Sequence, residues 1–363
     1  MKSSPIRVLF VVPGAGIAGL NTILSTLIQN LRPGQVQPTL VLEKDLPARG
    51  RLDFLTRLIR RKRIQIVHSF DGAGTGARAA CLLGLPHVWS IAGTLEDTFV
   101  ARTRQSLDPL PAIIESMSRV VTVPSRALAL SEFPDLSRSK LRIIPWGVEQ
   151  PRPTRPRGWL KEKLGLSPQS SLIALVANFH PAKRHRDFLE AARRIRRTQP
   201  AARFLIAGRC VGNSSRSRAI SRGTRAQVLR RIRTLGLGHS LRIAPFNPAD
   251  WASWYREINV LISPSREGMS LAVLQAGACG VPVVAADIGA APEMIQDGRT
   301  GLLVPFGRPA ALAGATLKIL SSAKLARRLQ SASRRRIRTH FSARKQADTL
   351  SKLYRGLLAS SGP

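Results

Sequence analysis

Short apolar runs alternate with amphipathic stretches along the chain. Residues 6–12, Ile-Arg-Val-Leu-Phe-Val-Val, are rich in β-branched side chains and end at Pro13-Gly14, which predicts a buried strand and then a turn. The same signal predicts strands at 39–42, 64–68, 88–91, 119–123, 141–144, 172–176, 203–207, 241–243, 260–262, 281–285 and 301–304. Apolar residues at helical spacing predict helices at 21–31, 52–61, 188–198, 310–320 and 347–358. This alternation predicts an α/β protein with parallel sheets covered by helices.

A proline-rich segment divides the pattern into two halves. Residues 150–158, Gln-Pro-Arg-Pro-Thr-Arg-Pro-Arg-Gly, can form neither a helix nor a central strand. A chain of 363 residues is also longer than one core usually needs. We therefore expect two Rossmann-like, doubly wound domains, residues 1–150 and 151–345, which face a central cleft. We expect a C-terminal helix within 346–363 to pack back towards the first domain. Ligands bind at the carboxyl ends of the strands in such sheets.

Composition excludes several classes of protein. The cysteines Cys81, Cys210 and Cys279 lie far apart, which excludes a zinc ribbon and a small disulfide-stapled module. The first apolar run is too short for the core of a signal peptide, and no run reaches the length of a membrane span. We expect a cytoplasmic protein.

The charge of the chain is strongly positive. Lys and Arg number 57 against 21 Asp and Glu, a formal net charge of +36, and the basic residues gather at 184–197, 203–233 and 324–345. Three explanations stay open: a solvated arginine-rich surface, peripheral binding to the anionic inner face of a membrane or to a lipid-linked acceptor, and nucleic-acid binding. Nucleic acid is the least favoured, because aromatic residues make up only 5% of the chain and do not interleave with the basic runs.

A glycine-rich loop, Gly14-Ala15-Gly16-Ile17-Ala18-Gly19, follows the first strand. It matches Gly-x-Gly-x-x-Gly, the pattern whose glycines let backbone N–H groups approach the pyrophosphate of a dinucleotide. However, Pro13 precedes the first glycine, and Glu43 lies 29 residues beyond Gly14, further than the roughly 20 residues of that pattern. Three interpretations stay open: a tight turn needed for packing, a loop that approaches another ligand, and an NAD or FAD site.

The segment 263–284 holds the densest candidate chemistry. A strand ends in a polar loop with Glu267, a helix begins near Ser270, and another strand starts at Val281. Gln275 lies two turns from Glu267 near one helix face, so both side chains can reach a ligand that lies along it. The start of this helix offers an anion site suited to a diphosphate, formed by the backbone N–H groups of Gly268, Met269, Ser270 and Leu271.

These features resemble the group 1 (GT4-like) family of retaining glycosyltransferases, whose members have the GT-B fold. The segment from Glu267 to Gln275 is similar to the EX7E region of that family. The resemblance covers most of the chain. It includes the glycine-rich loop and the segments Val67-His68, Val120–Ser125, Ile144–Glu149, Val176–Lys183 and Gly298–Val304.

The resemblance implies a role for each motif. Glu267 would contact the donor sugar, Gln275 the nucleotide ribose, and Lys183 the donor diphosphate. Retaining cleavage of a sugar–phosphate bond needs a stabilised leaving group rather than a strong base, and a lysine with a helix N-terminus can provide this. The residues expected to bind the donor are Gly16, Asn178, Lys183, Arg184, Glu267, Gly268, Met269, Ser270, Leu271 and Gln275. The first domain would take the acceptor, with a loop that contains Gly14, Gly16, Gly19 and Asn21.

Three positions depart from the family pattern. Gln275 stands where the family has a second Glu. Asn178 stands where the family has an arginine that pairs with the diphosphate, which leaves that charge to Lys183, helped by Arg184. Ala92 stands where many members have an acceptor-side histidine. We count His68 with Glu267 and Lys183 as a candidate catalytic residue, against the alternative that a histidine at a strand end is structural.

The expected function is metal-independent, retaining transfer of a hexose from a UDP- or GDP-type nucleotide sugar to a glycan, a lipid-linked or another hydroxyl acceptor, in the synthesis of cell-envelope polysaccharide. We expect no cofactor and no metal site, because the chain lacks an Asp-x-Asp sequence and His180 and His185 flank Lys183 without further ligands. Two alternatives stay open: an impaired homologue that binds a nucleotide sugar or an anionic polymer, and a dinucleotide-dependent oxidoreductase.

Overall fold

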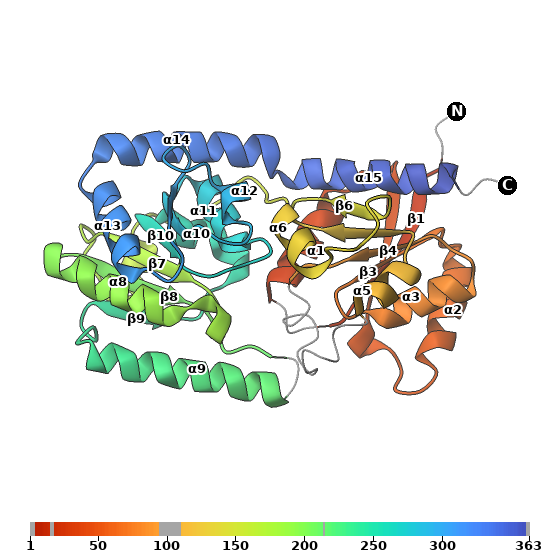
Figure 1. Ribbon diagram of the computed structural model, residues 1–363, viewed down its shortest axis with the longest axis horizontal. Coiled ribbons are helices and arrows are strands. Elements are labelled where there is room, and N and C mark those ends of the chain that lie inside the picture. Colours follow the sequence, from red (N-terminus) through yellow and green to blue (C-terminus); the bar gives the residue numbers. More distant parts are fainter. Residues whose placement is uncertain (1–3, 15–17, 94–109, 213–214, 361–363) are drawn as a thin grey trace. The chain divides into compact units, whose positions relative to one another are not determined.

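The structure, a computed structural model, describes residues 4–14, 18–93, 110–212 and 215–360. The chain forms two compact units: unit 1 comprises Met1–Gly147 and Ala343–Pro363, and unit 2 comprises Val148–Ser342. Each unit contains a six-stranded sheet in which all neighbouring strands run parallel, with helices packed on it (Figure 1). The expected α/β architecture of two Rossmann-like units is confirmed.

The sheet of unit 1 has the strand order β2-β1-β3-β4-β5-β6. Its strands are β1 (Ile6–Val12), β2 (Val36–Leu42), β3 (Ile66–Phe70), β4 (His87–Ser90), β5 (Val120–Val123) and β6 (Leu141–Ile143). Its helices are α1 (Ala18–Asn30), α2 (Arg51–Lys62), α3 (Gly74–Leu82), α5 (Leu110–Ser116), α6 (Arg126–Glu132) and α15 (Ala343–Ala359). The strand order reverses between β1 and β3, which makes their carboxyl ends the ligand-binding edge typical of this fold.

The C-terminal helix α15 is part of unit 1 (Figure 1). Its side chains Leu350 and Tyr354 join α1 and the strands in one hydrophobic cluster. Arg32, just after α1, pairs with Asp348 of α15 at 3.2 Å. The backbone N–H of Gly147 donates to Oε1 of Gln346 at 2.9 Å. Apolar and polar contacts therefore both hold α15 in this unit.

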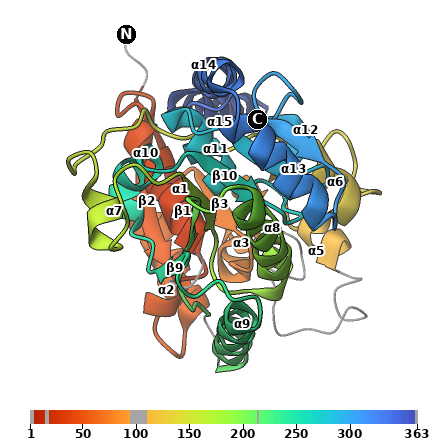
Figure 2. The same ribbon diagram turned by 90° about the vertical axis from the view of Figure 1, so that its left-hand side faces the viewer.

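Unit 2 has the strand order β12-β11-β10-β7-β8-β9. Its strands are β7 (Leu172–Val176), β8 (Arg203–Ala207), β9 (Leu241–Ala244), β10 (Val260–Ser263), β11 (Val283–Ala286) and β12 (Leu302–Val304). Its helices are α7 (Trp159–Lys163), α8 (His185–Thr198), α9 (Ser215–Thr234), α10 (Trp251–Arg256), α11 (Leu271–Cys279), α12 (Ala291–Met294), α13 (Pro309–Leu320) and α14 (Ala323–His340). Helices α8 and α13 lie side by side in both views (Figures 1 and 2). Here the order reverses between β7 and β10.

Part of the arginine content has a structural use. Arg334 of α14 donates from Nη2 to the carbonyl of Cys279, the last residue of α11, at 2.9 Å. Arg336 donates to the carbonyls of Glu293 and Met294 at the end of α12, at 2.6 and 2.8 Å. These guanidinium groups satisfy helix C-terminal carbonyls that lack partners within their own helices.

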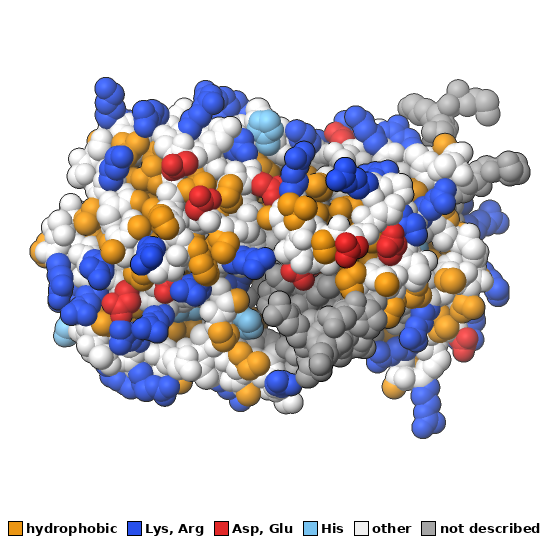
Figure 3. Space-filling view, viewed as in Figure 1, with side chains coloured by type: hydrophobic (Ala, Val, Ile, Leu, Met, Phe, Trp, Pro, Cys, Tyr) orange, Lys and Arg blue, Asp and Glu red, His pale blue; other side chains and the backbone are white. Residues whose placement is uncertain are grey.

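Many other basic side chains are exposed. Lys and Arg are spread over the face shown in Figure 3. Helix α9 has no acidic residue, and it exposes Arg216, Arg218, Arg222, Arg225, Arg230 and Arg233. Within the described parts of the chain, no helix combines the length and the apolar character needed to cross a membrane.

Candidate functional site

In unit 2, residues predicted to bind the donor lie at the switch point of the sheet, which is the place where the strand order reverses. Strands β7 and β10 are direct parallel neighbours, with Ile173 opposite Val260. The loop after β7 carries Asn178 and Lys183, and the loop after β10 carries Glu267. Parallel neighbours end at the same edge of a sheet, so both loops lie where this fold binds its ligands.

Lys183 and Glu267 form an ion pair. Nζ of Lys183 lies 3.0 Å from Oε2 of Glu267, and the side chains are 30% and 19% exposed. Lys183 ends a short 3₁₀ helix, Pro181–Lys183, which the proline at its first position favours. The structure therefore places together the two charged residues that the sequence motifs singled out, although the chain separates them by more than 80 residues.

Glu267 is held in place by three neighbours. The hydroxyl of Ser265 donates to its other carboxylate oxygen, Oε1, at 2.7 Å. The backbone N–H of Ala290 donates to its carbonyl at 3.0 Å. Gly289, with φ +58, passes so close that a β-carbon there would lie 2.6 Å from the same carbonyl oxygen. The loop between β11 and α12 thus fixes the backbone of Glu267.

Helix α11 begins four residues after Glu267 and carries Gln275 in its second turn. Ser270 is its N-cap residue, and the Ser270 side chain makes no capping hydrogen bond. The first N–H groups of any helix lack partners within it, and its positive end favours an anion. Gln275 is 4% exposed. Its amide can accept a hydrogen bond from a ligand hydroxyl and donate one to a ligand oxygen.

Asn178 and Arg184 are engaged by the protein. Oδ1 of Asn178 accepts a hydrogen bond from the backbone N–H of Arg209 at 3.2 Å. Nε of Arg184 lies 2.5 Å from Oδ2 of Asp187, and its guanidinium lies 4.6 Å from the ring centre of Phe306. Asp187 and Phe306 therefore orient Arg184, and Lys183 is the cation in contact with Glu267.

Two histidines, His180 and His185, flank Lys183. His185 is buried and stacks on Phe179 at 5.2 Å. Burial, followed by the charge of Lys183, lowers the pKa of His185 to about 4. In the described parts of the chain, no three His, Cys, Asp or Glu side chains gather as a metal site would require.

In unit 1, the structure describes part of the glycine-rich loop. Gly16 lies outside the described residues, and Asn21 is exposed on α1. Gly14 has φ +133 and packs on Lys44, whose Cγ would lie 3.0 Å from an added β-carbon. At Gly19 an added β-carbon would meet no described atom within 4 Å, so helix packing does not require this glycine.

Glu43, the acidic residue that follows the second strand, bonds to the start of α3. Its Oε1 accepts a hydrogen bond from the backbone N–H of Thr75 at 2.9 Å, near the start of α3. A dinucleotide site of the Gly-x-Gly-x-x-Gly type uses the acidic residue after the second strand to bind the ribose. This contact weakens the dinucleotide interpretation of the loop.

His68 lies in the core of unit 1. Its Nδ1 is 2.6 Å from the hydroxyl of Tyr354, and its Nε2 is 2.7 Å from the hydroxyl of Ser90. Burial, with a smaller effect from His87, holds the pKa of His68 well below its usual value. Both ring nitrogens of His68 are thus within hydrogen-bond distance of protein hydroxyls. His68 has no free ring nitrogen for an acceptor substrate, and it is not part of the proposed site.

Asp71 is a candidate functional residue of unit 1 that the sequence motifs did not single out. It follows β3 with φ +45, a conformation that is uncommon outside glycine, and its side chain is buried. Oδ1 accepts a hydrogen bond from the N–H of Ala92 at 2.7 Å, so a carboxylate lies directly beside the position at which many members of the resembled family carry a histidine. The only signal in the sequence is an acidic residue after a buried strand.

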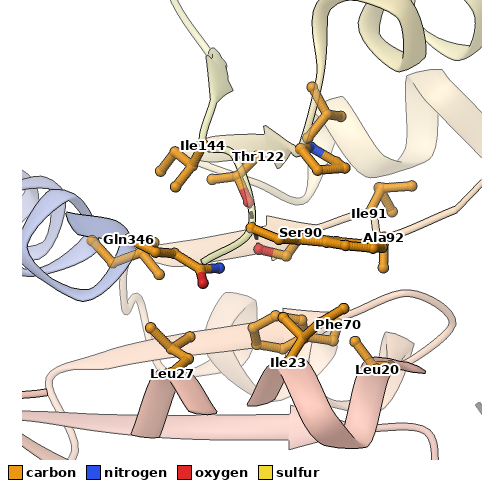
Figure 4. Close-up of a pocket in the computed structure, with 14 residues that line it drawn as sticks. Leu20, Ile23, Leu27, Phe70, Ser90, Ile91, Ala92, Thr122, Ile144 and Gln346 are labelled. Atoms are coloured by element: carbon orange, nitrogen blue, oxygen red, sulfur yellow. Dashed lines mark hydrogen bonds between the residues drawn. The ribbon is translucent and has the colours of Figure 1, made fainter. Parts of the chain in front are cut away.

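A pocket opens at the same edge of the unit 1 sheet (Figure 4). Apolar side chains of α1, Leu20, Ile23 and Leu27, form one wall. Ser90, Thr122 and Gln346 add polar groups, and the hydroxyls of Ser90 and Thr122 bond to each other. The pocket is therefore mainly apolar with a few convergent polar groups.

Parts of the chain are similar to known glycosyltransferases. Residues 170–322 match the family model of the glycosyl transferases group 1. D-inositol 3-phosphate glycosyltransferase of Streptomyces bingchenggensis is 32% identical over 186 residues, which are 51% of this chain and 40% of that protein. The protein of the same name from Acidothermus cellulolyticus is 30% identical over 235 residues, 63% of this chain and 51% of that protein. The chain spans about half of the length of these curated relatives, or less.

Solved structures share the fold over nearly the whole chain. A glycosyltransferase from Rickettsia africae has a TM-score of 0.78, 18% identity and coverage of 99% of this chain and 100% of that one. Anabaena HepE, solved in complex with UDP and glucose, has a TM-score of 0.80 and 14% identity over 97% of this chain and 100% of its own. Residues 170–322 thus match a glycosyl transferases group 1 domain, and the chain has the two-domain GT-B fold of these solved structures.

Proposed function

We propose that this chain is a glycosyltransferase that moves a hexose from a UDP- or GDP-type nucleotide sugar to a hydroxyl group of a glycan or lipid-linked acceptor, with retention and without a metal ion. The observation that carries the proposal is the 3.0 Å contact between Lys183 and Glu267 at the switch point of unit 2. Gln275, a buried residue of the helix that begins four residues after Glu267, adds to it.

Each of these groups has a role in the proposed reaction. Lys183 and the start of α11 stabilise the diphosphate as the bond to the anomeric carbon breaks, because both place positive charge where negative charge develops. Glu267 accepts hydrogen bonds from hydroxyls of the donor sugar, and Gln275 bonds to the ribose. Stabilising the leaving group in this way needs no strong base, which supports retention.

The relatives support a nucleotide-sugar donor and suggest acceptors to test. The curated relatives are named for transfer to D-inositol 3-phosphate. HepE has been solved with UDP and glucose, and TarM, another protein of this fold, with UDP and α-GlcNAc-glycerol. We further propose that the chain acts in the cytoplasm in the synthesis of cell-envelope polysaccharide, at the inner face of the membrane, where the arginines of α9 would meet anionic lipid.

An impaired homologue that binds a nucleotide sugar without transferring it is the second candidate. It is favoured by the neutral side chains of Gln275 and Asn178 at positions that the family pattern fills with charge, and by the pairing of Arg184 with Asp187. A dinucleotide-dependent oxidoreductase is not proposed, because Glu43 is engaged with Thr75.

A product-detecting screen tests the proposal. UDP- and GDP-sugars are combined with inositol 3-phosphate, glycan and polyprenyl-linked acceptors, with and without EDTA, and products are identified by mass spectrometry and by the anomeric coupling in NMR spectra. We expect one donor to give product with retained configuration at the same rate in EDTA. Nucleotide binding without any product would favour the impaired homologue, and an absence of nucleotide binding would contradict both candidates.

A further inference from the structure

Glu267 is more tightly fixed than the lysine that it pairs with. Ser265 holds its carboxylate, and Gly289 and Ala290 hold its backbone. Lys183 ends a short 3₁₀ helix, is 30% exposed and carries its charge on a flexible four-carbon stem. When Lys183 moves towards a new anion, the negative charge of Glu267 therefore stays at the edge of the site.

A nucleotide-sugar donor and its nucleoside diphosphate product would interact differently with the Lys183–Glu267 ion pair. A nucleoside diphosphate competes with Glu267 for Lys183, and it brings negative charge close to a carboxylate that it cannot bind. A nucleotide sugar also competes with Glu267 for Lys183, but its sugar hydroxyls donate hydrogen bonds to Glu267. Hydrogen bonds to a charged acceptor are about twice as strong as neutral ones, so the sugar compensates Glu267 for the lost cation.

We infer that the Lys183–Glu267 ion pair makes the site discriminate against the nucleoside diphosphate product in favour of the sugar-bearing donor. Glu267 is then a specificity-determining residue in addition to a sugar ligand, and its charge speeds the release of the product. This inference rests on the proposed function, because it assigns the site to a nucleotide sugar.

The test compares wild type with Glu267→Gln, which keeps the shape of the side chain and removes its charge. The matched control is Glu190→Gln, which removes the same charge from another partly buried pair of unit 2, between α8 and Arg231 of α9. Calorimetric titrations use UDP and UDP-glucose, and GDP and GDP-mannose. Steady-state measurements add the inhibition constant of the nucleoside diphosphate and the KM of the donor.

We expect Glu267→Gln to bind the nucleoside diphosphate about fivefold more tightly than wild type, the size of effect that a partly exposed ion pair supports. Binding of the sugar nucleotide should stay the same or weaken, so the ratio of the two dissociation constants changes by fivefold or more. Glu190→Gln should leave both constants at the wild-type values. Ser265→Ala removes the hydrogen bond that holds the Glu267 carboxylate but keeps the carboxylate itself. This variant should bind the nucleoside diphosphate about twofold more tightly than wild type.

The outcomes distinguish a failure of this inference from a failure of the proposed function. If wild type binds nucleotide and neither Glu267→Gln nor Ser265→Ala tightens the diphosphate, the inference is overturned and the proposed donor site stands. If neither wild type nor any variant binds UDP, GDP or their sugars, the proposed function fails and the inference fails with it. Tightening in Glu190→Gln of the same size would show a general charge effect and would also overturn the inference.

Discussion

The backbone of Gly289 lies so close to Glu267 that a β-carbon on Gly289 would come within 2.6 Å of the Glu267 carbonyl oxygen. Gly289 also has a left-handed φ of +58, which side chains rarely adopt. The next N–H, that of Ala290, donates to the same carbonyl. One loop thus sets the position of the carboxylate that we assign to the donor sugar.

We expect Gly289→Ala to lower kcat/KM at least about tenfold while the protein stays folded. The new methyl group must push the backbone of Glu267 aside, and small misplacements of reacting groups are costly. The matched control is Gly223→Ala on α9, where an added β-carbon meets no described atom within 4 Å. The control should keep wild-type activity and gain up to about 1 kcal/mol of stability from helix propensity. Wild-type turnover in Gly289→Ala would contradict the positioning role.

Gln275→Glu should tighten nucleotide binding about fivefold, and Gln275→Ala should weaken it below wild type. A glutamine can still accept a hydrogen bond from a ribose hydroxyl, but it lacks the charge assistance of glutamate, a difference near 1 kcal/mol. Titration of the three proteins with UDP and GDP measures this. The same response from all three, with no binding by wild type, would contradict the nucleotide site assigned to Gln275.

Helix α9 should give the protein salt-sensitive adhesion to anionic vesicles. Its exposed arginines contribute about 1 kcal/mol each near such a surface, and this attraction is screened over about 8 Å at physiological salt. Replacement of Arg218, Arg222 and Arg225 by Gln should reduce co-sedimentation. The matched control replaces Arg57, Arg60 and Arg61 on α2, which are also exposed. Equal binding to neutral and anionic vesicles would favour a merely solvated arginine surface.

The stability of the fold should fall as the pH falls from about 6.5 towards 4. Burial lowers the pKa of His87 and of His185 to about 4, and it holds the pKa of His68 well below its usual value. Unfolded histidines take up protons near pH 6.5, so acid favours the unfolded chain. One such histidine changes the free energy of unfolding by about 2 kcal/mol between pH 7.5 and 5.

Denaturant unfolding at pH 7.5 and 5 measures this effect. His185→Leu should remove about 2 kcal/mol of the pH dependence. An unchanged pH dependence in His185→Leu would contradict the neutral state assigned to this histidine.

The sequence pattern predicted the strands better than the helices. Strands β1, β7 and β8 have the expected bounds, because fully buried strands appear as uninterrupted apolar runs. Helices α9 and α14 are the longest of those that the pattern does not predict. The inward face of α9 includes Ser221 and Thr224, and that of α14 includes Ser333, so arginine and serine hide the apolar periodicity.

In the site, relationships within one segment could be predicted from the sequence, and contacts between distant segments could not. Glu267 and Gln275 share one loop and helix, so their spacing was visible in the sequence. The contact of Lys183 with Glu267 needed the strand order that makes β7 and β10 neighbours. The bond from His68 to Tyr354 joins residues 286 positions apart, and no local pattern could have predicted it.

Nucleotide binding by Lys183→Met is the most direct test of the central claim, that unit 2 binds a nucleotide-sugar donor through Lys183 and Glu267. Wild type and Lys183→Met are titrated with UDP and GDP in EDTA, with Lys318→Met of α13 as the matched control. Loss of a charged contact costs about 1.5–3 kcal/mol. We predict that wild type binds one nucleotide without metal, that Lys318→Met binds it equally well, and that Lys183→Met binds it at least about tenfold more weakly. Equal dissociation constants for wild type and Lys183→Met would contradict the claim.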